Sequence, residues 1–146
     1  MSTKLKLNIL SPERKLVSGL LVDSVTLPTT EGQIQILPGH AAIMGQLTTG
    51  ILRYDGAEGS KKFEAAAIST GFFEVNDDDV TVLAETIELG KEIDRGRATA
   101  AFAKAQQILV ESELDEHAFK KYQLKLERAL IRQQVAAHVG DHTDRE

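Results

Sequence analysis

The sequence predicts two parts of different structure: an N-terminal antiparallel β-sandwich or flattened barrel, followed by a C-terminal antiparallel two-helix hairpin. All three prolines and eight of the eleven glycines precede residue 87, where short apolar stretches alternate with turn residues. After Gly90 the apolar residues recur every three or four positions, as on one face of a helix. We therefore expect a β domain over residues 1–86 and a linker, helical hairpin and loose tail over residues 87–146.

Five stretches of the first part show the alternation or the β-branched content of a strand. They are residues 4–9, 21–27, 33–37, 71–75 and 80–84. Pro28 is expected to end the second strand, and Pro38-Gly39-His40 to form a rigid turn in which His40 packs or hydrogen-bonds. The acidic run in Asn76–Asp79 suggests either calcium or a solvated hairpin turn. We favour the turn, because neither a glycine nor a later glutamate completes an EF-hand loop.

The second part contains two amphipathic stripes. The first comprises Ala98, Ala101, Phe102, Ala105, Ile108 and Leu109, and the second comprises Phe119, Tyr122, Leu126, Ala129 and Leu130. Asp94 and Asp115 are placed to cap the two helices, and Gly140 is expected to end the second. Burial of apolar surface contributes about 25 cal/mol per Å² to stability, and an alanine side chain has little apolar surface to bury. We therefore expect the hairpin to be held only weakly to its neighbours and to be able to move.

The composition excludes several classes of protein. No apolar run is long enough to span a membrane, the N-terminus lacks the apolar core of a secretory signal, and cysteine is absent. A net charge of −5 argues against nucleic acid as the main partner. Residues 120–132 are nevertheless basic, because they contain five cationic residues and a single acidic one, Glu127. This segment is either a solvated helix face or a partner contact.

Motifs that would indicate catalysis are missing. The sequence has no phosphate-binding glycine loop, no zinc-protease motif and no nucleophile elbow. Its four histidines are scattered, and His138 with His142 would supply two metal ligands without a third. We expect neither a catalytic residue nor a metal site, and hence a protein that is not an enzyme by itself.

The order of short motifs resembles the epsilon subunit of bacterial F-type ATP synthases along almost the whole chain. The matching segments are Ser11–Arg14, Glu31-Gly32, Ile36-Leu37-Pro38-Gly39-His40-Ala41, Gly50–Arg53, Gly71–Val75 and Val80–Glu85. Gln35 departs from the family pattern, which has a glycine before Ile36. The resemblance implies a β-sandwich joined to a helical hairpin.

A second motif, Ile93-Asp94-x-x-Arg97-Ala98, looks like the one that some family members use to bind ATP. The resemblance implies a site for ATP as a regulatory ligand, with no other cofactor. Its residues would be Glu88, Ile93, Asp94, Arg97, Ala98, Arg128 and Arg132. The forked guanidinium groups suit phosphate oxygens. The alternative is that Asp94 only caps its helix, that the arginines belong to a solvated face, and that Gly90 and Gly96 loosen the region.

The resemblance also implies partners and a location. A central-stalk subunit would bind the gamma subunit and the c-ring, couple rotation to ion transport, and lie on the cytoplasmic face of the bacterial inner membrane as a peripheral protein. An extended hairpin would contact the catalytic alpha and beta subunits and inhibit ATP hydrolysis. Its contact residues would be Lys120, Lys121, Lys125, Arg128 and Arg132. The rival interpretations are a free-standing nucleotide sensor and a helical adaptor on an unrelated β module.

Overall fold

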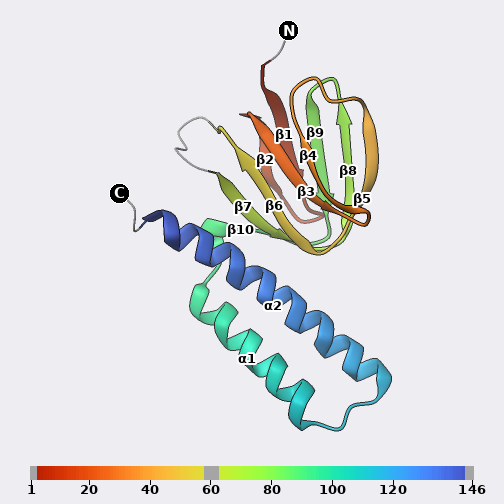
Figure 1. The fold of residues 1–146 in the computed structure, drawn as a ribbon, viewed down its shortest axis with the longest axis vertical. Coiled ribbons are helices and arrows are strands. Elements are labelled where there is room, and N and C mark those ends of the chain that lie inside the picture. Colours follow the sequence, from red (N-terminus) through yellow and green to blue (C-terminus); the bar gives the residue numbers. More distant parts are fainter. Residues whose placement is uncertain (1–2, 58–62, 144–146) are drawn as a thin grey trace. The chain divides into compact units, whose positions relative to one another are not determined.

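The computed structural model describes residues 3–57 and 63–143. The chain forms two compact units, one up to Glu88 and one from Leu89 onward, and each is described here by itself. The first unit is built of strands, and the second of two long helices that run antiparallel (Figure 1). The predicted fold class, a β-sandwich followed by a helical hairpin, is therefore confirmed.

The described part of the chain contains ten strands. They are β1 (Leu5–Leu10), β2 (Lys15–Val22), β3 (Ser24–Thr29), β4 (Gly32–Ile36), β5 (Ile43–Leu47), β6 (Gly50–Asp55), β7 (Glu64–Ile68), β8 (Gly71–Asn76), β9 (Asp79–Ala84) and β10 (Ile87–Leu89). One layer has the order β4-β3-β6-β7-β10 and the other β5-β8-β9-β1-β2. The layers are connected where Thr29 of β3 pairs with Leu47 of β5. Strand β1 runs parallel to β9 and antiparallel to β2. Strand β3 is antiparallel to β4, β5 and β6, and the pairs β5–β8, β6–β7 and β8–β9 are also antiparallel.

The core lies between the layers and consists of large aliphatic side chains. The largest that are fully buried are Leu5, Leu7, Ile9, Leu27, Ile36, Leu47, Leu52, Val22, Val25, Val75, Val80 and Val82. Strands β1 and β9 alternate strictly between buried and more exposed positions, as expected where one face of a sheet covers the core. These two strands were predicted from the same alternation.

The predicted single strand over residues 21–27 is wrong, because the chain changes layer at Asp23. Val22 still pairs with Leu5 of β1, whereas Ser24 already pairs with Asp55 of β6. The bend is held by Asp23 N, which donates to the Asp55 carbonyl at 2.7 Å, and by a 2.9 Å ion pair between Lys4 and Asp23. Such bends let one strand serve two sheets.

Pro28 does not end a strand, contrary to the sequence prediction. It lies buried inside β3, opposite Gln33 of β4. Its carbonyl accepts a hydrogen bond from Thr48 N at 3.0 Å. In an extended strand the N–H of a residue points to the same side as its carbonyl, so the donor that proline lacks would have faced β5 and β6 and not the β4 ladder.

Two turns meet at one end of the sandwich. Gly39 has φ +85° in the Pro38-Gly39-His40 turn, and Asp77 and Asp78 have φ +49° and +65° in the β8–β9 hairpin. The hairpin interpretation of the acidic run is thus confirmed. Gly39 N donates to the Asp78 carboxylate at 2.7 Å, and the His40 ring Nδ1 lies 2.7 Å from the Ala41 carbonyl oxygen. His40 therefore hydrogen-bonds within its turn, as predicted.

The second unit contains a short 3₁₀ turn, η1 (Gly90–Glu92), and the helices α1 (Arg95–Glu111) and α2 (Glu116–Thr143). Both predicted caps are confirmed: the Asp94 carboxylate accepts from Arg97 N at 3.0 Å, and that of Asp115 from Ala118 N at 2.7 Å. The buried residues of the described helical part are small, namely Ala98, Ala105, Ala129, Val135 and Ala136. Gly140 does not end α2, which continues to Thr143, because one glycine costs a helix only about 1 kcal/mol. The predicted loose tail otherwise falls on residues 144–146, outside the described residues.

Candidate functional site

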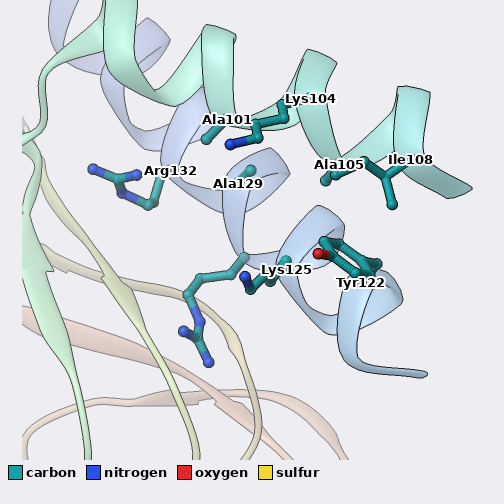
Figure 2. Close-up of a pocket in the computed structure, with 9 residues that line it drawn as sticks. Ala101, Lys104, Ala105, Ile108, Tyr122, Lys125, Ala129 and Arg132 are labelled. Atoms are coloured by element: carbon teal, nitrogen blue, oxygen red, sulfur yellow. The ribbon is translucent and has the colours of Figure 1, made fainter. Parts of the chain in front are cut away.

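A groove with basic walls lies between α1 and α2. Helix α1 contributes Ala101, Lys104, Ala105 and Ile108, and helix α2 contributes Tyr122, Lys125, Arg128, Ala129 and Arg132. Its volume is about 290 Å³, at the lower limit of the roughly 300–1,000 Å³ of small-molecule sites. In Figure 2, Lys104 extends from α1, while Lys125 and Arg132 extend from α2 on the opposite wall.

The groove exists because small and long side chains alternate along the two facing helix surfaces. Ala101, Ala105 and Ala129 lack the bulk to fill the space between the helices, and the latter two are buried at its base. The longer residues follow at intervals of three or four positions and therefore stand at its edges. Tyr122 closes the end nearest Ile108 (Figure 2). The result is an apolar floor bordered by flexible cations.

The charge of the groove has one sign. Four of its described lining residues, Lys104, Lys125, Arg128 and Arg132, are cationic, and none of the described lining residues is acidic. The Lys125 ammonium lies 5.1 Å from the centre of the Tyr122 ring, which holds it near the groove. Lysine and arginine provide several N–H donors each, and four such groups around one hollow suit a ligand that carries several anionic oxygens.

The structure brings together only part of the predicted ATP site. Arg128 and Arg132 line the groove, whereas Arg97 is exposed on the first turn of α1 and does not. Arg97 nevertheless precedes Ala101 by four residues, so it continues the same helix face by one turn. Ala98 is fully buried within the hairpin.

The other residues predicted to bind ATP do not line the groove. Asp94 caps α1 through its side chain. Ile93 follows η1, and its N–H donates to the Gly90 carbonyl at 3.3 Å. Glu88 is half-buried in β10 and belongs to the other unit. Their contribution to a ligand site stays a prediction.

Two lining residues were missed in the sequence, Lys104 and Tyr122. Lys104 follows Arg97 by seven residues, two helical turns, so Arg97, Ala101 and Lys104 share one face of α1. That spacing could have identified Lys104. Tyr122 was predicted only as part of the apolar stripe, since nothing in its spacing distinguishes a core residue from the wall of a groove.

A second basic surface occupies the outer face of α2. It comprises His117, Lys120, Lys121, Leu124, Lys125 and Arg128 around a hollow of about 320 Å³. Four of the five predicted partner-contact residues belong to it, and Arg132 does not. Leu124 is half exposed among these cations. We call this surface the outer face of α2.

The sandwich carries an exposed apolar area on the layer that contains β5, β8 and β9. Phe72 and Leu83 pair across β8 and β9, and their exposed fractions are 60% and 46%. Both line a shallow hollow of about 470 Å³ together with Pro12 and Leu47. Large apolar side chains exposed in one cluster are typical of an interaction surface.

The described residues contain no group of three or more His, Cys, Asp or Glu side chains that could hold a metal ion. Within the same residues, no helix is both long and apolar enough to cross a membrane.

Comparisons with known proteins agree with these features. The family model of the ATP synthase Delta/Epsilon chain β-sandwich domain matches residues 4–90, and the model of its long α-helix domain matches residues 91–137. The ATP synthase epsilon chain of Trichlorobacter lovleyi is 43% identical over 138 residues, covering 93% of this chain and 96% of the relative. That of Halalkalibacterium halodurans is 39% identical over 132 residues, covering 90% and 96%.

Solved structures show the same fold. A chain of the Euglena gracilis mitochondrial ATP synthase superposes with a TM-score of 0.78 at 26% identity, covering 94% of this chain and 84% of that one. A chain of the Tetrahymena thermophila mitochondrial ATP synthase central stalk and c-ring superposes with a TM-score of 0.55 at 15% identity, covering 92% and 99%. From the two domain matches and the identity over nearly the whole chain, the protein belongs to the family of ATP synthase epsilon chains.

Proposed function

We propose that this chain is a non-catalytic central-stalk subunit of a rotary F-type ATP synthase, and that its hairpin restrains ATP hydrolysis until ATP binds and relieves the restraint. Family membership supports the first part, and the similar Euglena chain comes from a structure that contains F1 and the c-ring. The basic groove between α1 and α2 is the observation that carries the second part. The gamma subunit, the c-ring and the alpha and beta subunits are its proposed partners, on the cytoplasmic face of the bacterial inner membrane.

The sandwich is the proposed anchoring part. Its exposed Phe72 and Leu83 offer an apolar surface that association with gamma would remove from water. Its core of large, fully buried aliphatic residues gives it a stable shape of its own. An anchor of this kind transmits rotation because it does not rearrange when it is loaded.

The hairpin is the proposed movable part. Its described buried residues are four alanines and one valine, so separating it from its surroundings exposes little apolar area. The outer face of α2 bears cations that complement acidic residues on a catalytic subunit. Held against such a partner, the hairpin would block rotation in the direction of hydrolysis.

ATP would oppose this arrangement by binding the closed hairpin. The groove needs both helices, so a ligand that occupies it favours the state in which α1 and α2 lie together. A ligand at a hundred times its dissociation constant stabilises the state it binds by about 2.7 kcal/mol. A bias of that size reverses a marginal preference between two hairpin states.

The test of ATP binding is a calorimetric titration of the full chain. We expect saturable binding that is lost in the double variant Arg128→Ala/Arg132→Ala. Arg95→Ala is the matched control, since Arg95 is an exposed arginine at the start of α1 outside the groove. A flat titration at millimolar ATP, or equal losses in the variant and the control, would refute the ATP-sensing part.

The test of the brake is a truncation that ends at Gly90. This end point keeps β10, which pairs with β7, and removes both helices. We expect the fragment to co-purify with gamma as the full chain does, but to leave the hydrolysis of the reconstituted complex uninhibited. Full inhibition by the fragment would contradict the brake, and failure of the full chain to co-purify with gamma would favour the rival, a free-standing nucleotide sensor.

A further inference from the structure

We propose that a polyphosphate in the groove and an acidic partner on the outer face of α2 exclude each other directly, because both need Lys125 and Arg128. This inference rests on the proposed function and adds a mechanism of regulation to it. The two surfaces were identified separately, one between the helices and one on α2 alone. The same two residues appear in both linings.

The overlap follows from the helical geometry of α2. Tyr122, Ala129 and Arg132 line the groove only, and His117, Lys120 and Leu124 line the outer face of α2 only. Lys125 and Arg128 are three residues apart and stand at the border between these sets, so each long side chain reaches either side. Both are exposed, and neither is fixed to one surface by burial.

Charge prevents the two ligands from sharing these cations. Two unit charges of like sign about 4 Å apart repel each other, and they do so more strongly near a protein surface than in water. Phosphate oxygens bonded to Arg128 on one side and a carboxylate bonded to it on the other would be held within that range. Lys125 and Arg128 would then serve one ligand only, and the other ligand would lose both contacts.

Direct exclusion and a purely conformational switch predict different results for a hairpin that stays closed. If ATP acted only by favouring the closed state, a partner peptide that binds the closed hairpin would bind equally well with ATP present. With shared cations, ATP competes with the peptide even when the helices do not move. Reciprocally, the peptide weakens the binding of ATP by the same factor.

The chain offers a matched set of variants. Lys104→Ala removes a cation from the groove only, Lys120→Ala removes one from the outer face of α2 only, and Lys125→Ala removes one that both surfaces use. All three residues are exposed lysines on a helix, and Lys125 also lies 5.1 Å from the centre of the Tyr122 ring.

The experiment measures the affinity of the full chain for ATP, and for a helical peptide of about 15 residues rich in Glu, Asp and Leu. We expect Lys104→Ala to weaken only the binding of ATP, and Lys120→Ala to weaken only the binding of the peptide. Lys125→Ala should weaken the binding of both, and each affinity should fall by about two- to five-fold. In the unsubstituted chain, the apparent dissociation constant of the peptide should rise in proportion to ATP concentration without a plateau.

A ternary complex, a plateau in the competition curve, or a Lys125→Ala variant that weakens only one ligand would overturn the inference while leaving ATP sensing intact. Absence of ATP binding in the unsubstituted chain would overturn both proposals. Absence of peptide binding would overturn the shared-cation inference alone, because the titration with ATP does not depend on the peptide.

Discussion

The sandwich and the hairpin differ most in what they bury. The sandwich buries leucine, isoleucine and valine almost completely, as at Leu5, Leu7 and Ile9 in β1. In the described part of the helices, only Val135 among the buried residues is larger than alanine. Full burial of a leucine contributes about 1.5–3 kcal/mol, whereas an alanine methyl contributes only about 0.8 kcal/mol. One chain therefore produces one unit with a strong core and one with a weak core.

This difference suits the two tasks proposed for the sandwich and the hairpin. A part that transmits torque has to resist deformation, and a dense aliphatic core provides that resistance. A part that switches needs two states of similar free energy, and small buried residues keep the cost of leaving either state low. The comparison predicts that substitutions act on one unit at a time, with larger effects in the sandwich.

The largest effect is expected from Leu7→Ala. Leu7 is fully buried in β1, and removing its side chain leaves a cavity in the core. The free energy of unfolding should fall by about 2–5 kcal/mol, measured by denaturant titration of the β-type circular dichroism signal. Leu124→Ala, at a position 51% exposed on α2, is the control and should change it by less than about 0.5 kcal/mol. Equal losses would contradict the contrast between the two units.

The next largest effect on the stability of the sandwich should come from raising the pH. Burial raises the pKa of Tyr54 from 10.0 to about 12, and the Glu64 carboxylate, opposite it on β7, adds to the shift. The folded unit thus holds its proton more tightly than the unfolded chain does. This contribution to stability is complete below pH 10 and is lost as the pH rises towards 12, by about 2–3 kcal/mol.

Tyr54→Phe isolates that contribution, since lysines titrate in the same range. The slope of unfolding free energy against pH between 10 and 12 should be shallower in Tyr54→Phe than in the unsubstituted chain. Identical slopes would show that the tyrosine is not perturbed by its burial.

In the hairpin, the largest effect should come from excess volume and not from lost volume. Ala105 is buried at the base of the groove, so Ala105→Leu forces the helices apart and should cost about 1–3 kcal/mol. The same change at the exposed Ala103 is the matched control. The helical circular dichroism signal should melt earlier in Ala105→Leu only, with the β signal unchanged. A loss of β signal would mean that the two units do not unfold separately.

Sequence patterns predicted the elements whose burial is local. Strands β1, β8 and β9 show a clear alternation of apolar and polar residues. In both helix caps, a carboxylate accepts a hydrogen bond from the backbone N–H three residues later. Strand β7 was missed because Glu64–Ile68 contains three alanines, which favour strands poorly, and four of its five residues are buried. The corner at Asp23 was missed because it depends on bonds to Asp55 and Lys4, far away in the sequence.

The site shows the same limit. Arg128 and Arg132 could be found from their spacing on one helix, but the groove needs a second helix at a particular register. The motif resemblance therefore included Arg97, which lies a turn beyond the groove, and omitted Lys104, which lines it. Periodicity assigns residues to a face, and only the packing of the two faces decides which of them meet.

The smallest effect concerns Asp94, and it sharpens the assignment of the site. Asp94→Ala removes the cap of α1 and should cost the hairpin about 1 kcal/mol, measured by its helical melting. Asp94→Asn retains an oxygen that accepts from Arg97 N, so helix stability should stay nearly unchanged. If Asp94 is only a cap, Asp94→Asn should bind ATP as the unsubstituted chain does. A weaker affinity with intact helicity would instead mean that the carboxylate contacts the ligand, and that the bound state extends the groove past Ala101 to the first turn of α1.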